Sequence, residues 1–496
     1  MVTNAAGHSG HGVPAAAQPA APANPTAPPT APPTAAPTAP PTAPPTAAPT
    51  AAPTAAPTAG TSRPSQQRAR ARAGPELAAL RSRGRMRGAA ALLGPAFVAA
   101  IAYVDPGNFA TNFSAGAASG YRLAWVIVAA DLMAMLVQYL SAKVGVATGR
   151  DLPELCREQL PRGVTLGLWA QAELVAMATD VAEFVGAAVG LNLLFRTPLP
   201  VAALITAVVA FGILALDQRG YRRFELAIMG LLGLVLLGFG YDLVAVHPSA
   251  TGLARGLVPG FGGSDSLLLA VGIIGATVMP HVVYLHSALT KDRVRCRDDA
   301  ERRALLRFQR ADVLVALGAA GLVNLAMLIV AAALFRTAGG RAAGGTAGGA
   351  AAAGGWIGAA HADLGRLVGG GAALAFAVAL LASGLSSSSV GTYAGQVVMR
   401  GFLGRCVPLF VRRAVTMLPA LIILAVGLPP TTSLVFSQVV LSFGIPFALV
   451  PLVALTRRAD IMGPLVNSRL TTVAAASTAG LIIALNLYLL WSTLAR

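Results

Sequence analysis

Long apolar runs separated by short polar loops dominate the chain from about residue 88 onward. Each run is about 20 residues long, which is the length that an α-helix needs to cross the hydrocarbon core of a bilayer. The pattern therefore predicts an all-α polytopic membrane protein with about eleven transmembrane helices. The expected spans are at about 92–115, 123–144, 164–194, 201–216, 226–246, 267–289, 313–334, 372–399, 409–426, 434–455 and 473–490.

Composition agrees with a membrane location. The 496 residues are 55% hydrophobic and only 11% charged, whereas a soluble domain carries about 25% charged residues. The net charge of +17 could indicate binding to nucleic acid. Most of the 37 Lys and Arg residues, however, lie in the N-terminal tail and in alternate loops, which is the positive-inside pattern. We therefore expect an inner or plasma membrane protein with a cytosolic N-terminus, an external C-terminus and no nucleic-acid partner.

Two regions differ in character. Residues 1–80 form a Pro/Ala/Thr-rich tract without an apolar face to bury, so we expect a disordered cytosolic tail. Residues 88–495 hold all the apolar runs and are the expected transmembrane domain. A Gly/Ala-rich stretch at 339–355 is expected to form a flexible external loop.

The first span is interrupted by Asp105, Pro106, Gly107 and Asn108. Proline removes a backbone donor and frees carbonyls, which need partners in a region without water. An ionisable residue at this depth indicates an ion pathway. A metal ion or a lined cavity would satisfy these groups, and a simple kink capped by Asp105 is the alternative.

The sixth span carries a second interruption, Met279-Pro280-His281. Interrupted helices at matching positions in two halves are typical of inverted repeats with a binding site at the midplane. The spacing therefore predicts two inverted five-helix halves, with broken helices 1 and 6.

The side chains at the two breaks suggest divalent-metal chemistry. Asp105 and Asn108 offer oxygens, and the freed carbonyls of Ala102 and Ala276 add more. Oxygen ligands alone suit Mg²⁺ or Ca²⁺, whereas the thioether of Met279 favours Mn²⁺, Fe²⁺, Co²⁺ or Cd²⁺. Met279 could equally fill a gap in the packing. Gln438 in the tenth span could reach a midplane ion or serve packing.

Acids on the third span suggest a proton route. Glu173, Asp180 and Glu183 share one helical face. They could relay protons or form ion pairs with Arg412 and Arg413 of the ninth span, and the two readings are compatible because pairing tunes carboxylate pKa values.

Three further polar residues stand in the spans. His281 and His286 on the sixth span could carry protons or be hydrogen-bonded core residues. Asp131 in the second span has no assigned partner.

These motifs resemble the NRAMP family of proton-coupled divalent-metal transporters, in particular its bacterial manganese transporters. The likeness covers about residues 88–490. It includes both breaks and the stretches 94–97, 178–184, 392–399 and 437–438. Asp131 and Arg400 depart from the pattern.

The resemblance implies the fold of sodium-coupled amino-acid transporters. It implies proton-coupled symport of Mn²⁺, and also of Fe²⁺, Co²⁺ or Cd²⁺, into the cytosol by alternating access, with no cofactor and no enzymatic activity. Another transporter of the same fold, for amino acids or Mg²⁺, is the alternative. The implied metal ligands are Asp105, Asn108, Met279, the carbonyls of Ala102 and Ala276, and in some conformations Gln438. The implied proton route comprises His281, Asp180, Glu183, Arg412 and Arg413.

Overall fold

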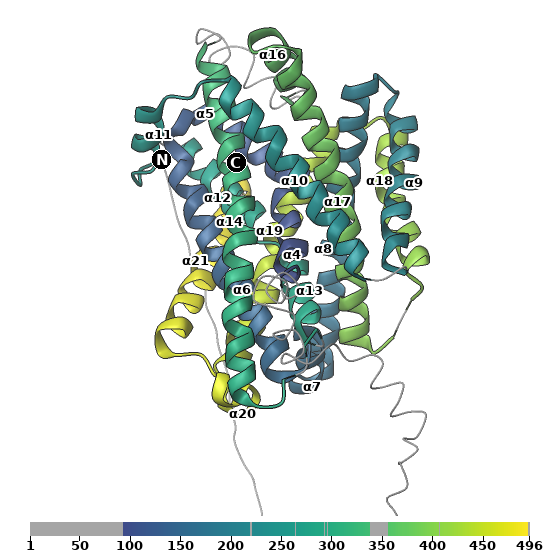
Figure 1. The fold of residues 1–496 in the computed structure, drawn as a ribbon, viewed down its shortest axis with the longest axis vertical. Helices are drawn as coiled ribbons and strands as arrows, with labels where there is room; N and C mark the ends of the chain where they lie inside the picture. Colours follow the sequence, from purple (N-terminus) through teal and green to yellow (C-terminus); the bar gives the residue numbers. More distant parts are fainter. Residues whose placement is uncertain are drawn as a thin grey trace, which may run out of the picture. The chain divides into compact units, whose positions relative to one another are not determined.

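The computed structural model describes residues 93–218, 221–262, 264–291, 293–294, 296–337, 356–405 and 407–494. This part of the chain is helical almost throughout and contains no strand (Figure 1). The expected tail at 1–80 and the Gly/Ala-rich stretch at 339–355 lie outside the described residues.

Each of the eleven expected spans coincides with one helix or with a broken pair of helices. The first is α4 (Pro95–Ala100), η1 (Ile101–Val104) and α5 (Pro106–Ser119), and the sixth is α12 (Ser264–Thr277) and α13 (Pro280–Lys291). The unbroken spans are α6 (Ala124–Thr148), α8 (Arg162–Phe195), α9 (Leu199–Gln218), α10 (Tyr221–Ala245), α14 (Asp299–Thr337), α17 (Gly370–Leu403), α18 (Leu409–Val426), α19 (Pro430–Thr456) and α21 (Arg469–Leu494).

Short helices connect the spans. They are η2 (Gly120–Leu123), α7 (Leu152–Gln159), α11 (Ala250–Gly256), α16 (Trp356–Leu367), α20 (Ala459–Met462) and η4 (Gly463–Leu465). The first ten spans form the two predicted five-helix halves, and a broken helix opens each half.

Length and apolarity alone mark fewer spans than eleven. Among the described residues, seven helices are long and apolar enough to cross a membrane, or eight if one bent pair counts as a span. Part of the difference arises because α5 and α6 run together as one stretch, Pro106–Thr148. The broken or short helices at Pro95–Val104 and Leu199–Ile213 are apolar but below the length limit.

Small residues let the central helices approach closely. A Cβ on Gly384 of α17 would lie 2.7 Å from the carbonyl oxygen of Glu183 on α8, so only glycine allows this contact. Aromatic rings hold α5 to the same core: Phe109 lies 5.2 Å from Phe239 of α10 and 6.0 Å from Phe376 of α17, centroid to centroid. Both contacts are edge-on, the geometry that aromatic pairs prefer.

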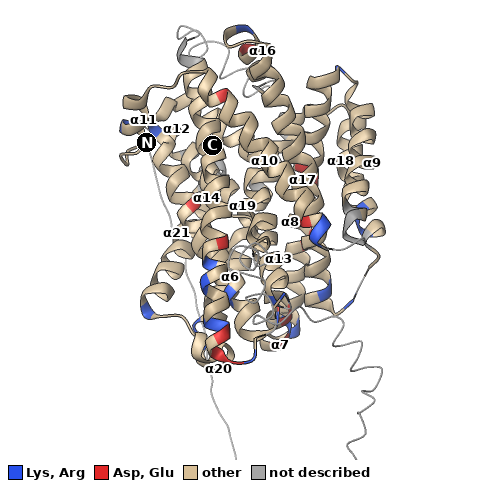
Figure 2. Cartoon of the chain, in the orientation of Figure 1, with Lys and Arg blue, Asp and Glu red and all other residues tan. Residues whose placement is uncertain are grey.

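Charge is concentrated at one end of the bundle. Figure 2 shows Lys and Arg residues gathered at the end that carries α7 and α20, with few charged residues along the middle. Large apolar side chains are exposed on the outer helix faces, for example Leu237 on α10, which is 73% exposed. This distribution matches a bundle whose sides face lipid.

Candidate metal site

Asp105 occupies the junction between the two parts of the first span. The backbone becomes extended at Asp105, and Pro106 then opens α5 at a position where a missing N–H costs nothing. The Oδ1 atom of Asp105 accepts a hydrogen bond from the backbone N–H of Asn108 over 2.8 Å. Asp105 therefore caps α5, and its charge lies at the positive end of that helix dipole.

Gln438 of α19 faces the other oxygen of the same carboxylate. Its Nε2 atom donates to Oδ2 of Asp105 over 3.5 Å, and its Oε1 atom is buried without a hydrogen-bond partner. A Cβ on Gly107 would lie 1.6 Å from Nε2 of Gln438. Glycine is thus required at position 107 for Gln438 to reach Asp105.

The break frees the backbone carbonyl of Tyr103, and a hydrogen-bond network of three asparagines forms around it. The side-chain amides of Asn108 and Asn324 both donate to this oxygen, the latter over 2.8 Å. Asn112 donates to Oδ1 of Asn324 over 2.9 Å. In this arrangement the Oδ1 atom of Asn108 is buried and has no hydrogen-bond partner. Sequence reasoning missed Tyr103, Asn112 and Asn324, although asparagines within the apolar first and seventh spans were a usable signal.

The second break lies in a helix pair that packs beside the first. Helix α12 ends at Thr277, and α13 begins at Pro280, so Val278 and Met279 are non-helical. α12 packs against α5 and α19, and α13 packs against α4. Ala276 and Met279 are buried, as is Ala102 on the first span.

The donor atoms of this region form a mixed set. Within the described residues, no three His, Cys, Asp or Glu side chains are grouped so that they could hold a metal ion. A cation here would instead meet one carboxylate together with amide oxygens, and Asn108 and Gln438 each offer an oxygen that has no partner. Such orphaned buried acceptors are uncommon and require an explanation.

Two of the third-span acids form ion pairs with the ninth span. Glu173 binds Arg412 in a fork, with contacts of 2.9 and 2.6 Å. Asp180 pairs with the buried guanidinium of Arg413 over 3.0 Å. The ion pairs that the sequence allowed as one of two readings are therefore present. Glu183, by contrast, is buried and both of its carboxylate oxygens lack a hydrogen-bond partner.

The acids converge with His281. A Cβ on Gly391 of α17 would lie 2.9 Å from Glu183 Oε2 and 3.5 Å from Asp180 Oδ1. The Nδ1 atom of His281 lies 3.5 Å from the hydroxyl of Thr179, the residue before Asp180, and its Nε2 atom has no partner. The structure thus brings three of the predicted proton-route residues to one region between α8, α13 and α17.

His286 is part of a different hydrogen-bond chain. Its Nδ1 atom lies 2.9 Å from Oε1 of Gln138, and Gln138 donates through Nε2 to the Tyr103 hydroxyl over 2.6 Å. Gln138 therefore connects the His286 ring to the Tyr103 hydroxyl. The chain links α13 to η1, so it ties the two broken spans together.

Comparison with known proteins decides the family. The sequence profile described as "Natural resistance-associated macrophage protein-like" (Nramp) matches residues 96–492. The Bacillus subtilis divalent metal cation transporter MntH is 51% identical over 408 residues, which are 82% of this chain and 93% of the relative. The Deinococcus radiodurans MntH is 49% identical over 431 residues, 87% of this chain and 96% of the relative.

The chain belongs to the Nramp family. Membership makes it a multi-pass membrane transporter of divalent metal cations and not an enzyme. A solved variant of the Eremococcus coleocola manganese transporter, itself of the Nramp type, superimposes with a TM-score of 0.73 at 34% identity, covering 83% of this chain and 88% of that one.

More distant structures confirm the fold of this Nramp chain. Mhp1, a nucleobase-cation-symport-1 family transporter, aligns with a TM-score of 0.53 at 16% identity over 81% of this chain and 93% of that one. The fold that the family resemblance implied is therefore shared with a transporter outside the Nramp family.

In this Nramp chain the start of the first span is tightly held. The Asp312 carboxylate of α14 accepts from the backbone N–H groups of Gly94 and Ala96, the latter over 3.0 Å. Arg293 donates to the Leu93 carbonyl over 3.0 Å and also pairs with Glu225 of α10. These contacts close the bundle around the beginning of α4.

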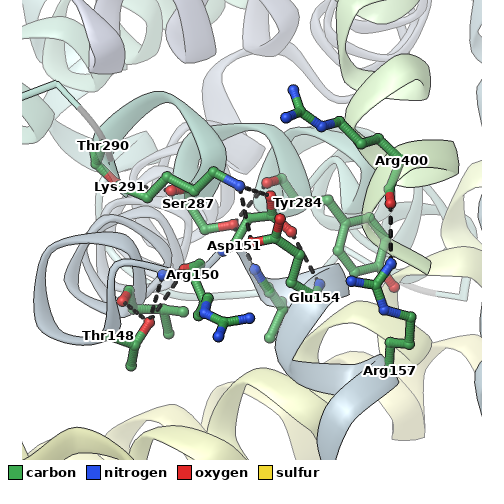
Figure 3. Close-up of polar contacts among 12 residues, drawn as sticks. Thr148, Arg150, Asp151, Glu154, Arg157, Tyr284, Ser287, Thr290, Lys291 and Arg400 are labelled. Carbon is green, nitrogen blue, oxygen red and sulfur yellow. Dashed lines mark hydrogen bonds and ion pairs between the residues drawn. The ribbon is translucent and has the colours of Figure 1, made fainter. Parts of the chain in front are cut away.

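A second set of contacts holds the end of the sixth span (Figure 3). The ammonium of Lys291, the last residue of α13, lies 2.6 Å from Asp151 and 2.9 Å from Glu154. Both acids belong to the capping box that begins α7. Burial alone would raise the pKa of Glu154, but hydrogen bonds from Lys291 and the Asp151 backbone outweigh it and lower the pKa.

Neighbouring contacts fix α7 in place. The N–H of Leu152 donates to the Ser287 hydroxyl of α13 over 2.9 Å. Arg157 donates to the carbonyl of Arg400 over 3.3 Å, as Figure 3 shows. Arg400 of α17 thus meets α7 through its backbone carbonyl. We call the contacts of Lys291 with Asp151 and Glu154 the α7–α13 latch.

Proposed function

We propose that this chain is a proton-coupled symporter that carries Mn²⁺, and also Fe²⁺, Co²⁺ and Cd²⁺, into the cytosol by alternating access. The observation that carries the proposal is the junction at Asp105, where the capping carboxylate meets Gln438 and where Asn108 and Gln438 each keep an unpartnered buried oxygen. The MntH and manganese-transporter names of the relatives support the choice of ions.

The proposed ligands are the side chains of Asp105, Asn108 and Met279, the carbonyls of Ala102 and Ala276, and Gln438 once the helices move. The carboxylate offsets part of the charge of the ion, and the amide and carbonyl oxygens replace its water. The thioether of Met279 is a soft ligand, so it disfavours the hard ions Mg²⁺ and Ca²⁺.

The proposed proton route runs beside the metal site and not through it. His281 and Glu183 carry polar atoms without partners, and Asp180 leads from them to Arg413 through a buried ion pair. The fork of Glu173 and Arg412 extends the same line along α8 and α18. A proton on Glu183 would remove an uncompensated buried charge.

Transport requires the two breaks to move against the remaining helices. The contacts at the start of α4 and the α7–α13 latch close one end of the bundle in this conformation. Their release would open the site to the opposite side, as in transporters built on inverted repeats. We propose that this end is cytosolic, with the N-terminus on the same side and the C-terminus external. Residues 88–495 would form the transporter domain and residues 1–80 a cytosolic tail.

Uptake by purified protein in liposomes tests the proposal. Mn²⁺ entry should be accelerated by an inward proton gradient and should be accompanied by acidification of the lumen. A competition series with Fe²⁺, Co²⁺, Cd²⁺, Mg²⁺ and Ca²⁺ then ranks the ions. Uptake without any proton influx would overturn proton coupling, and preferred uptake of Mg²⁺ would overturn the choice of metal.

A further inference from the structure

Asp131 is a buried acid that the proposed site does not use. It lies on α6 and is 8% exposed, and no cation among the described residues contributes to its electrostatic environment. Its Oδ1 atom is buried without a hydrogen-bond partner. A charged group in this position is costly unless a positive charge compensates it.

The carboxylate of Asp131 packs against Gly321 on the facing helix, α14. A Cβ on Gly321 of α14 would lie 2.3 Å from Oδ2 of Asp131 and 2.5 Å from its Cγ. Any other residue at 321 would displace the acid, so the contact depends on glycine. The carboxylate therefore lies against the backbone of α14 and not in a space open to lipid.

The same turn of α14 leads to the first break. Asn324 follows Gly321 by three residues, which is about one helical turn, and its amide donates to the Tyr103 carbonyl over 2.8 Å. Helix α14 packs against α6, which carries Asp131, and also against η1, which contains Tyr103. Tyr103 is two residues before Asp105. Asp131 thus lies on the α6–α14 side of the broken segment that holds the proposed metal ligands.

The balance of charges at the first break suggests a role for Asp131. A divalent ion at Asp105 would be offset by one carboxylate there, which leaves one positive charge in a region without bulk water. We propose that Asp131 is a positioning residue whose negative charge, when a divalent ion is bound at the break, supplies the second compensation and so favours divalent cargo. It acts through space, and it does not touch the ion. This inference rests on the proposed function.

The test is the concentration dependence of Mn²⁺ and Cd²⁺ uptake at neutral pH by liposomes containing Asp131→Asn. This variant keeps the shape of the side chain and removes the charge. Loss of a charge that stabilises a bound divalent ion should raise KM by about tenfold or more, with little change in the maximal rate. Because a charge does not distinguish soft from hard metals, the KM values for Mn²⁺ and Cd²⁺ should rise by the same factor.

The control is Asp363→Asn, which removes an acid that pairs with the exposed Arg366 on α16 and should leave both KM values unchanged. Asp131→Ala serves in the same way should the Asn variant not fold. An unchanged KM in the folded variant would show that Asp131 contributes no effective charge at the site and would overturn the inference. A rise for one metal only would also overturn it, because that indicates direct ligation. Failure of the wild-type protein to take up Mn²⁺ would instead overturn the proposed function.

Discussion

Gln438 and Asp105 are 333 residues apart in the chain, yet the amide of Gln438 lies 3.5 Å from the carboxylate of Asp105. The contact joins α19 to the first break, so it crosses between the two halves of the fold. Gln438 therefore connects the two halves at the proposed site, and we expect this contact to change when the halves move.

Gly107→Ala should disrupt this contact. The new methyl group would lie 1.6 Å from Nε2 of Gln438 and would push the amide away from Asp105. Since a displacement of about 1 Å at a working site can lower a rate about a hundredfold, we expect Mn²⁺ uptake to fall by at least about tenfold. Gly167→Ala on α8 is the matched control, because no atom lies within 4 Å of its added Cβ. Equal uptake by the two variants would contradict this role of Gln438.

Met279→Ala should change selectivity more than rate. The oxygen ligands remain, so Mn²⁺ uptake should persist, but without the thioether Ca²⁺ and Mg²⁺ should compete. Met417→Ala removes another buried methionine, on α18, and controls for loss of packing. If Ca²⁺ stays excluded from the Met279 variant, the thioether is not the filter.

Glu183→Gln should separate metal entry from proton entry. The amide cannot take up a proton, so Mn²⁺ uptake should lose its acceleration by an inward proton gradient, while metal entry without a gradient continues. A pH-sensitive dye in the liposome lumen measures the co-transported protons. Glu158→Gln, at a partly exposed acid that pairs with Arg150, should behave as the wild type. An undiminished proton influx in the Glu183 variant would exclude Glu183 from the route.

Lys291→Met should loosen the α7–α13 latch. Cys156 on α7 reports on this event, because it is fully buried and burial raises the pKa of its thiol to about 12. Its alkylation should be slow in the wild type and at least about fivefold faster in the variant, since local opening exposes the thiol. Arg366→Met breaks an exposed pair on α16 and should leave the alkylation rate unchanged. Equal rates in all three proteins would show that the latch does not hold α7.

The breaks and the helix order could be predicted from the sequence because they depend on local chemistry. Proline cannot continue a helix, and an acid followed by Pro106 is a strong helix start. The ion pairs of Asp180 and Glu173 could also be suggested from the sequence, because buried charges need partners and Arg412 and Arg413 lie in an expected span.

Contacts between segments that are far apart in the sequence could not be predicted. No local pattern shows that Asn324 meets the Tyr103 carbonyl, or that Gly321 makes room for Asp131, because both depend on how α6, α14 and η1 pack. The same applies to Lys291 and α7. For Glu183, the sequence showed an acid on the same face as its neighbours, but only the packing shows that it lacks the partner that Asp180 has.

The central claim is that Asp105 binds the transported metal. The most direct measurement is calorimetric titration of Mn²⁺ into purified wild-type protein and into Asp105→Asn, which keeps the size of the side chain and a cap for α5. The account predicts saturable binding to the wild type and its loss in the variant, with the variant still folded by its thermal unfolding curve. Mn²⁺ binding of unchanged affinity in Asp105→Asn would contradict it.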